Sequence, residues 1–184
     1  ACTGAGVGPR RIDRVVGISK AYTTRVGSGP FPTEQENETG ERLRKVGAEF
    51  GATTGRPRRC GWWDAFAMAY AARINGLTDL AVTKLDVLTG IDPIRIGVGY
   101  KCNGRMLDDF PADLEDLAAC EPVYEEMPGW SEDISKITRA DDLPENARRY
   151  LARMEELTGV AVAVVSLGPQ RDSTIVFNSP FADD

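Results

Sequence analysis

The feature that most constrains the fold is a helix pattern followed at once by a β-branched apolar run. Residues 143–157 carry apolar side chains at helical spacing, with Pro144 in the first turn and Gly159 as a stop. Residues 160–165 are apolar and mostly β-branched, as in a buried strand. This order is typical of chains in which helices connect strands that pair in parallel.

The same alternation runs through the rest of the chain. Further helical segments are predicted at residues 10–22, 38–50, 62–77 and 113–119. Further strands are predicted at residues 80–83, 94–100, 122–126 and 174–177. The pattern indicates an α/β chain with a mixed, partly parallel sheet and flanking helices. No repeat or linker divides it, so residues 1–184 are expected to form a single unit.

The charge of the chain excludes two classes of partner. A net charge of −6 and a pI near 4.9 disfavour nucleic acid and anionic membranes, both of which select basic surfaces. The longest apolar stretches, residues 65–72 and 160–165, are well short of the ~20 residues that span a bilayer. We therefore expect neither a nucleic-acid nor a membrane partner.

Histidine is absent and the four cysteines contain no CxxC pair. These residues do not suit a zinc site or a disulfide framework, and they predict free thiols in a reducing cytoplasm. Without histidine the chain also lacks the commonest general base. Proton chemistry would need carboxylates or another polypeptide.

A polar loop precedes the helix predicted at residues 62–77. Its residues are Gly51, Ala52, Thr53, Thr54, Gly55, Arg56, Pro57, Arg58 and Arg59. Glycines free the backbone N–H groups, hydroxyls add donors, and arginine matches carboxylates or phosphates with two parallel hydrogen bonds. The loop has the composition of an anion cradle, although a solvated basic loop is the plainer alternative.

Two further polar segments each follow a predicted strand. Thr83-Lys84-Leu85-Asp86 has a carboxylate that can accept from the two adjacent donors of guanine, and a lysine stem that can lie along the base. A surface ion pair would explain the same residues. Residues 166–169, Ser-Leu-Gly-Pro, follow the next strand. Ligands bind beyond the carboxyl ends of strands in open α/β sheets, so the two segments are expected to converge, unless 166–169 is a plain turn.

Seven strings, in this order and spacing, carry a resemblance to a known family. They are TTRVGSGPFPTE, EFGATTGRPRR, GW, TKLDVL, PVYEEMPGW, EELTGV and VSLGP. Together they resemble adenylosuccinate synthetase nearly end to end. The resemblance implies the C-terminal part of a larger P-loop-type, GTP-dependent ligase fold. It also implies the joining of IMP and L-aspartate to adenylosuccinate with release of GDP and phosphate, the first committed step of AMP biosynthesis.

The resemblance also implies two sets of binding residues. The set for aspartate and IMP is Val26, Gly27, Ala52, Thr53, Thr54, Gly55, Arg56, Pro57 and Arg58. The set for GTP is Arg58, Lys84, Leu85, Asp86, Ser166, Leu167 and Gly168. Pro57 stands where relatives often have arginine.

The remaining parts of such a ligase are expected before Ala1, because the chain opens like an internal loop. These parts are the phosphate loop, the aspartate that binds Mg²⁺, the catalytic histidine and an arginine that reaches IMP across a homodimer interface. Catalytic residues and metal ligands are therefore not expected in this chain, and the chain alone should be inactive. A guanine-nucleotide-binding regulatory module and a structural fragment without ligand affinity are the alternatives.

Overall fold

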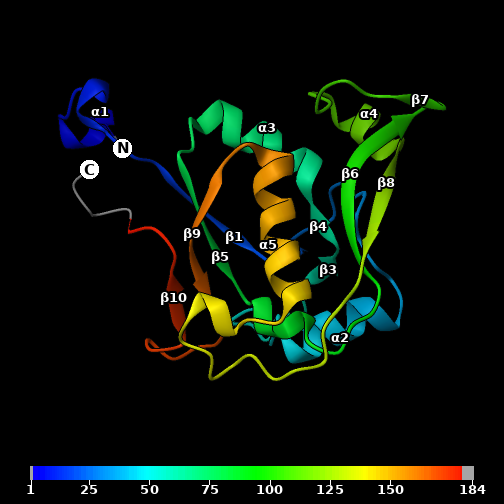
Figure 1. The fold of residues 1–184 in the computed structure, drawn as a ribbon. Coiled ribbons are helices and arrows are strands. Elements are labelled where there is room, and N and C mark those ends of the chain that lie inside the picture. The colour runs from blue at the N-terminus through cyan, green and yellow to red at the C-terminus, as the bar shows by residue number, and fades with distance from the viewer. Residues whose placement is uncertain (1, 180–184) are drawn as a thin grey trace.

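The computed structural model describes residues 2–179, which build two four-stranded sheets and a two-stranded ribbon, with helices packed between and around them (Figure 1). The first sheet has the order β1 (Val16–Lys20), β5 (Asp79–Thr83), β9 (Ala161–Ser166) and β10 (Thr174–Val176). The first three strands are parallel, and β10 pairs antiparallel to β9. The mixed, partly parallel sheet expected from the sequence is confirmed.

The second sheet is mostly antiparallel. It contains β4 (Trp63–Asp64), β6 (Ile94–Cys102), β7 (Arg105–Met106) and β8 (Cys120–Met127). The long strand β6 pairs with all three neighbours, in parallel only with β4. A two-stranded ribbon of β2 (Thr23–Arg25) and β3 (Arg59–Gly61) completes the strands of the described chain.

Five α-helices accompany the strands within residues 2–179. They are α1 (Cys2–Ala5), α2 (Glu38–Val46), α3 (Ala65–Asn75), α4 (Leu114–Ala118) and α5 (Glu145–Thr158). Short 3₁₀ turns lie at Pro9–Arg11, Leu85–Leu88 and Ala140–Asp142. Helices α3 and α5 end at glycines in the left-handed conformation, Gly76 and Gly159, as their sequences predict.

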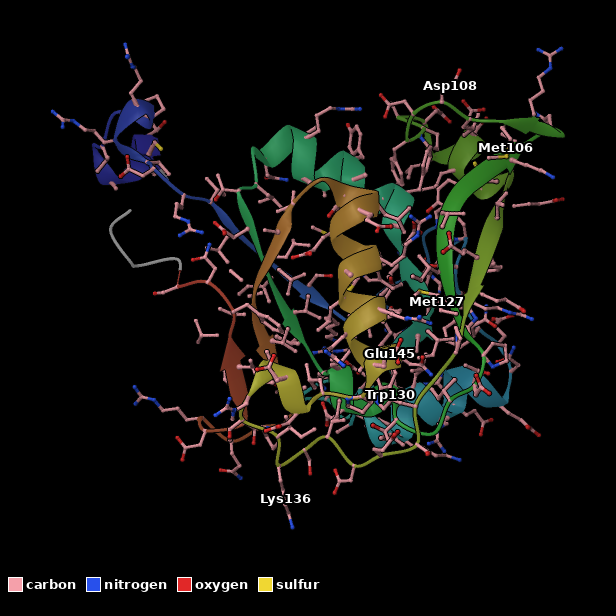
Figure 2. The ribbon with its side chains drawn as sticks, viewed as in Figure 1. Met106, Asp108, Met127, Trp130, Lys136 and Glu145 are labelled. Atoms are coloured by element: carbon pink, nitrogen blue, oxygen red, sulfur yellow. The ribbon has the colours of Figure 1, made fainter. Side chains whose placement is uncertain are left out.

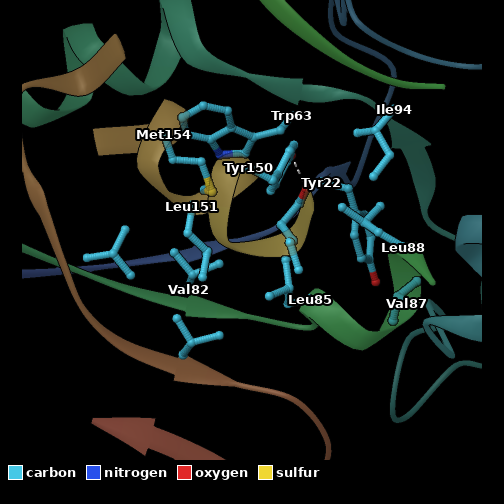
Figure 3. Packing of buried hydrophobic residues seen from close by; sticks show 14 of the residues in the cluster. Tyr22, Trp63, Val82, Leu85, Val87, Leu88, Ile94, Tyr150, Leu151 and Met154 are labelled. Carbon is cyan, nitrogen blue, oxygen red and sulfur yellow. Dashed lines mark hydrogen bonds between the residues drawn. The ribbon is translucent and has the colours of Figure 1, made fainter. Parts of the chain in front are cut away.

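The core lies where α5 packs on the parallel sheet. Tyr150, Leu151 and Met154 on the inner face of α5 are buried with Val82 of β5 and Trp63 (Figure 3). The buried Tyr150 hydroxyl donates to the carbonyl of Ala21 at 2.7 Å, which ties the helix to the end of β1. This packing places the carboxyl ends of the parallel strands at one edge, beside α2 (Figure 1). None of the described helices is long and apolar enough to cross a membrane.

Three helix predictions need correction. The helix predicted at 38–50 ends at Val46, because Gly47 caps it and Ala48 takes the left-handed conformation, φ 49°. Residues 10–22 do not form a helix, because only Pro9–Arg11 makes a 3₁₀ turn and β1 then pairs with β5. The helix predicted at 62–77 begins at Ala65, because the Asp64 side chain accepts from the amide of Ala67 and so caps it. Trp62 and Trp63, inside the predicted range, lie before the helix, and both are buried.

Candidate functional site

The first part of the site forms where β5 and β9 end. These strands are parallel, and Val82 pairs with Val165, so Thr83 and Ser166 reach the same edge of the sheet. Lys84 then adopts a left-handed conformation, φ 60°, which turns the chain into the 3₁₀ turn Leu85–Leu88. The two polar segments therefore converge, as the sequence predicts for loops that follow adjacent parallel strands.

A cavity of about 330 Å³ opens at this edge, and we call it the base pocket. Its lining comes from three separate segments: Val46, Gly47, Ala48, Thr83, Lys84, Asp86, Val87, Ser166, Gly168 and Pro169. The lining is mainly apolar with a few polar groups, which is the usual character of a pocket for a flat ligand. Of the predicted GTP set, the pocket brings together Lys84, Asp86, Ser166 and Gly168.

Asp86 provides the most distinctive group in the base pocket. One oxygen of its carboxyl group, Oδ1, is buried and has no hydrogen-bond partner among the described residues. Burial raises the pKa of this carboxyl group, and the nearby Lys84 charge offsets the rise only in part. A buried acceptor without a donor is costly, by about 1–3 kcal/mol, and a ligand with N–H groups would relieve that cost.

Leu85 and Leu167 have a different place. Both side chains are fully buried in the core rather than in the pocket lining. The Leu167 amide also donates to Ser173, and the Ser166 hydroxyl donates to the Gly168 carbonyl at 3.0 Å. These two leucines anchor the loops that carry the polar residues, so any ligand contact from them would have to come through their remaining backbone groups.

A second hollow, of about 160 Å³, lies over the polar loop, and we call it the arginine cradle. Four arginines contribute to its lining, which is Arg25, Val26, Gly27, Gly51, Thr54, Arg56, Pro57, Arg58 and Arg59. The cradle brings Val26 and Gly27 together with the polar loop at residues 51–59, which comes later in the sequence. This grouping suits a carboxylate or phosphate ligand.

Backbone hydrogen bonds close the polar loop on itself. The Gly51 amide donates to the Arg56 carbonyl and the Gly55 amide to the Gly51 carbonyl, both at 2.8 Å. Gly55 has φ +63°, which a residue with a side chain adopts only with strain. The Thr54 hydroxyl accepts from the Arg56 amide at 3.3 Å. Ala52, Thr53 and Gly55 belong to the same turn but lie exposed, outside the cradle lining.

The arginines of the cradle differ in how they are held. Arg59 is ion-paired with Glu34 and donates to the carbonyls of Gly27 and Gly29, so it holds the opposite wall in place. By contrast, the buried Nε atoms of Arg25 and Arg58 have no acceptor among the described residues. These two guanidinium donors leave hydrogen bonds available for an anion.

Glu49 lies between the base pocket and the arginine cradle. Its side chain is 1% exposed, and its carboxylate contacts Lys20 at 2.7 Å and both Arg58 and Lys84 at 3.2 Å. The Tyr22 hydroxyl donates to it at 2.6 Å. Burial alone would raise the pKa of Glu49, but the hydrogen bonds from Lys20 and Tyr22 and the charges of Lys20 and Lys84 hold it below its usual value.

Sequence reasoning missed several residues of this arrangement. Glu49, Arg25 and the end of α2 at Val46–Ala48 carry no spacing signal, because their contacts arise only when distant segments pack together. The charged Glu49 beside the glycine-rich loop, and Arg25 directly before Val26, were the available hints.

Comparisons with known proteins identify the family of this chain. A family model for adenylosuccinate synthetase matches residues 1–175. Adenylosuccinate synthetases of Carboxydothermus hydrogenoformans and Moorella thermoacetica are each 62% identical to this chain over 181 residues, or 98% of it. The chain belongs to the adenylosuccinate synthetase family.

The structure of fully ligated adenylosuccinate synthetase from Plasmodium falciparum has the same fold, with a TM-score of 0.91 and 41% identity over 95% of this chain. The chain spans 42% of the length of these relatives.

A magnesium ion in a nucleotide-dependent enzyme is usually held by one or two carboxylates together with substrate phosphates and waters. Within residues 2–179 no group of three or more histidine, cysteine, aspartate or glutamate side chains could hold a metal ion. The described part of the chain therefore presents no cluster of protein side chains that would hold the metal by itself.

Proposed function

We propose that this chain supplies the guanine- and aspartate-binding part of a GTP-dependent ligase that joins IMP and L-aspartate to form adenylosuccinate. The observation that carries the proposal is the buried, unpartnered oxygen of Asp86 in a pocket that also contains Lys84 and Ser166. An ionised carboxylate accepts from guanine N1–H and from its 2-amino group. Adenine does not present this pair of donors.

The neighbouring residues support the same ligand. The Lys84 stem lines the pocket while its ammonium group is turned to Glu49 and the Gly47 carbonyl, so its methylene groups are free to lie along a base. Ser166 and Gly168 line the facing wall. Val46 and Val87 add apolar surface.

We assign the arginine cradle to the dicarboxylate and the IMP side. Thr54 and Arg56 present a hydroxyl and a guanidinium that match a carboxylate, Thr53 lies in the same turn, and Val26 and Gly27 form the opposite wall. Arg58 lines the cradle and also contacts Glu49, and we assign it to the bound GTP.

Magnesium supplies charge neutralisation in phosphoryl transfer, and its ligands and the catalytic residues would belong to other parts of the full-length homodimer.

The cradle separates this proposal from a guanine-binding regulatory module. Such a module would need the base pocket but not a second, arginine-lined site that suits a dicarboxylate. Aspartate protection of the cradle arginines from chemical modification would favour the ligase, and its absence would favour the module.

Titration of the 184-residue chain with GDP tests the base pocket directly. We expect GDP to bind, ADP to bind far more weakly, and Asp86→Ala to abolish the preference for GDP. Asp108→Ala changes an exposed carboxylate and is the matched control. Equal binding of GDP and ADP would contradict the assignment of Asp86.

A further inference from the structure

Two cysteines lie directly opposite each other in the second sheet, away from both pockets. Cys102 is the last residue of β6 and Cys120 the first of β8, and the antiparallel register pairs them. Directly opposed residues of an antiparallel pair project from the same face, with Cβ atoms about 4.5–5.5 Å apart. The two thiols are therefore neighbours by strand register.

Hydrogen bonds bring the two sulfur atoms to one acceptor. The Cys120 thiol donates to the backbone carbonyl of Asp116 at 3.2 Å, and the Cys102 thiol contacts the same oxygen at 3.8 Å. A disulfide needs Cβ atoms about 3.5–4.5 Å apart, so only a small approach of two strand ends is required.

The local structure allows that approach. Asn103 and Gly104, with φ of 51° and 76°, form the two-residue turn that joins β6 to β7, so Cys102 lies beside a hairpin tip. Met106 and Asp108 lie at this end of the molecule, whereas Trp130 and Lys136 lie toward the opposite end (Figure 2). This end of the second sheet is distant from α2, whose last residue, Val46, lines the base pocket (Figure 1).

The two thiols differ in access to solvent. Cys102 is half-buried and lines an open cavity of about 400 Å³ together with Asn103, Arg105 and Asp116. Cys120 is buried, at 8% exposed. Arg105 lies directly opposite Cys102 in the β6–β7 pairing.

We propose that Cys102 and Cys120 form an oxidation site that closes reversibly into a disulfide with hydrogen peroxide as the oxidant. The Cys102 thiol loses its proton, and the thiolate attacks one peroxide oxygen. The O–O bond breaks, Cys102 becomes a sulfenic acid, and the other oxygen leaves as hydroxide, which takes up that proton to form water. The Cys120 sulfur then attacks the Cys102 sulfur, the S–O bond breaks, and the hydroxide leaves as water with the Cys120 proton. Two thiols are oxidised by two electrons, and one peroxide is reduced to two waters.

This order of steps follows from the surroundings of each thiol. Burial, the neighbouring Cys102 group and Asp116 raise the pKa of Cys120, so Cys120 is the poorer first nucleophile. Once Cys102 is oxidised, Cys120 has its target next to it. The bond would close the segment between them, which contains β7 and α4.

Thiol titration and peptide mapping test the site without reference to ligase activity. After peroxide treatment and removal of the oxidant, the four thiols of the denatured chain should fall to two, and dithiothreitol should restore them. Mass spectrometry of a non-reduced digest should show the peptides of Cys102 and Cys120 joined, with two hydrogens lost. This measurement on the unmodified protein does not depend on any variant folding.

Three variants sharpen the assignment. Cys102→Ser and Cys120→Ala should each prevent the linked peptide, whereas Cys2→Ser, at another half-buried thiol, should leave it unchanged. The proposal is overturned if the thiol count stays at four, if Cys102 ends as a stable sulfinic acid without a link, or if the linked peptides involve Cys2 or Cys60.

Discussion

The ammonium group of Lys84 lies 3.2 Å from the carboxylate of Glu49, which is buried between the two candidate binding pockets. Because the same carboxylate contacts Arg58, one buried charge orients a residue of the base pocket and a residue of the arginine cradle. Removing one member of a buried charge network costs about 3–5 kcal/mol, so this relationship affects both stability and binding.

Glu49→Gln should lower the free energy of unfolding by about 3–5 kcal/mol and, in the full-length enzyme, raise the KM for both GTP and aspartate. The side-chain size is kept, so the loss reports charge. Urea unfolding and steady-state kinetics measure the two effects. Glu41→Gln alters an exposed pair with Lys45 and is the control. A change in the KM for only one of the two substrates would contradict the proposal that Glu49 supports both pockets.

The pH dependence of stability gives a separate test of Glu49. Its folded-state pKa lies below the ordinary value of 4.5, so its stabilisation is present above pH 4.5 and is lost as pH falls through the folded-state pKa. Urea unfolding from neutral pH to about pH 3 should therefore show a smaller acid-induced loss in Glu49→Gln than in the unaltered protein. Equal losses would show that Glu49 does not contribute.

Asp86→Asn in the full-length enzyme should lower the use of GTP and improve the use of XTP. Asparagine offers one acceptor and one donor, so its amide opposes the 2-amino group of guanine but pairs with the carbonyl of xanthine. The lost charge-assisted bond is worth about 1.5–3 kcal/mol, which is about 10- to 150-fold in kcat/KM. Asp108→Asn is the exposed control. An unchanged GTP/XTP ratio would remove Asp86 from the base-reading role.

Arg56→Leu in the full-length enzyme should weaken the use of aspartate far more than the binding of guanine nucleotide. Truncating one partner of a charge pair that is desolvated in the complex costs about 2–5 kcal/mol, mostly from the carboxylate left unpaired. The KM for aspartate and the Kd for GDP, measured on the same preparation, give the comparison. Arg149→Leu changes an exposed arginine of α5 and should alter neither value.

The 184-residue chain alone should show no ligase turnover, although we expect it to bind GDP. Phosphoryl transfer depends on positioned charge and metal ions, and the described residues present no cluster of three or more metal-ligating side chains. Adenylosuccinate formation from GTP, IMP and aspartate can be followed with the purified chain and with the full-length enzyme. Turnover by the chain, free of host enzyme, would show that its own residues suffice.

Local sequence was enough to predict the elements in which the spacing of apolar residues agrees with the residues that begin and end the element. Helix α5 with its Gly159 stop, the buried strands β5 and β9, and the polar segments after those strands all follow from spacing and residue type. Strands that alternate with helices are expected to pair in parallel. The parallel pairing of β5 with β9 confirms this prediction. The convergence of Lys84 and Asp86 with Ser166 followed from that rule alone.

Tertiary structure decided what local pattern could not. Residues 16–20 have apolar positions that suit a helix or a strand, and pairing with β5 selected the strand. The end of α2 reached the base pocket, and Glu49 came to join Lys84 to Arg58, only because the helix and both loops pack at the same sheet edge. Such contacts depend on distant segments meeting, and one sequence carries no periodic signal for them. The sequence alone therefore predicted which residue types make up the site. Their grouping around the buried carboxylate of Glu49 was decided by the tertiary structure.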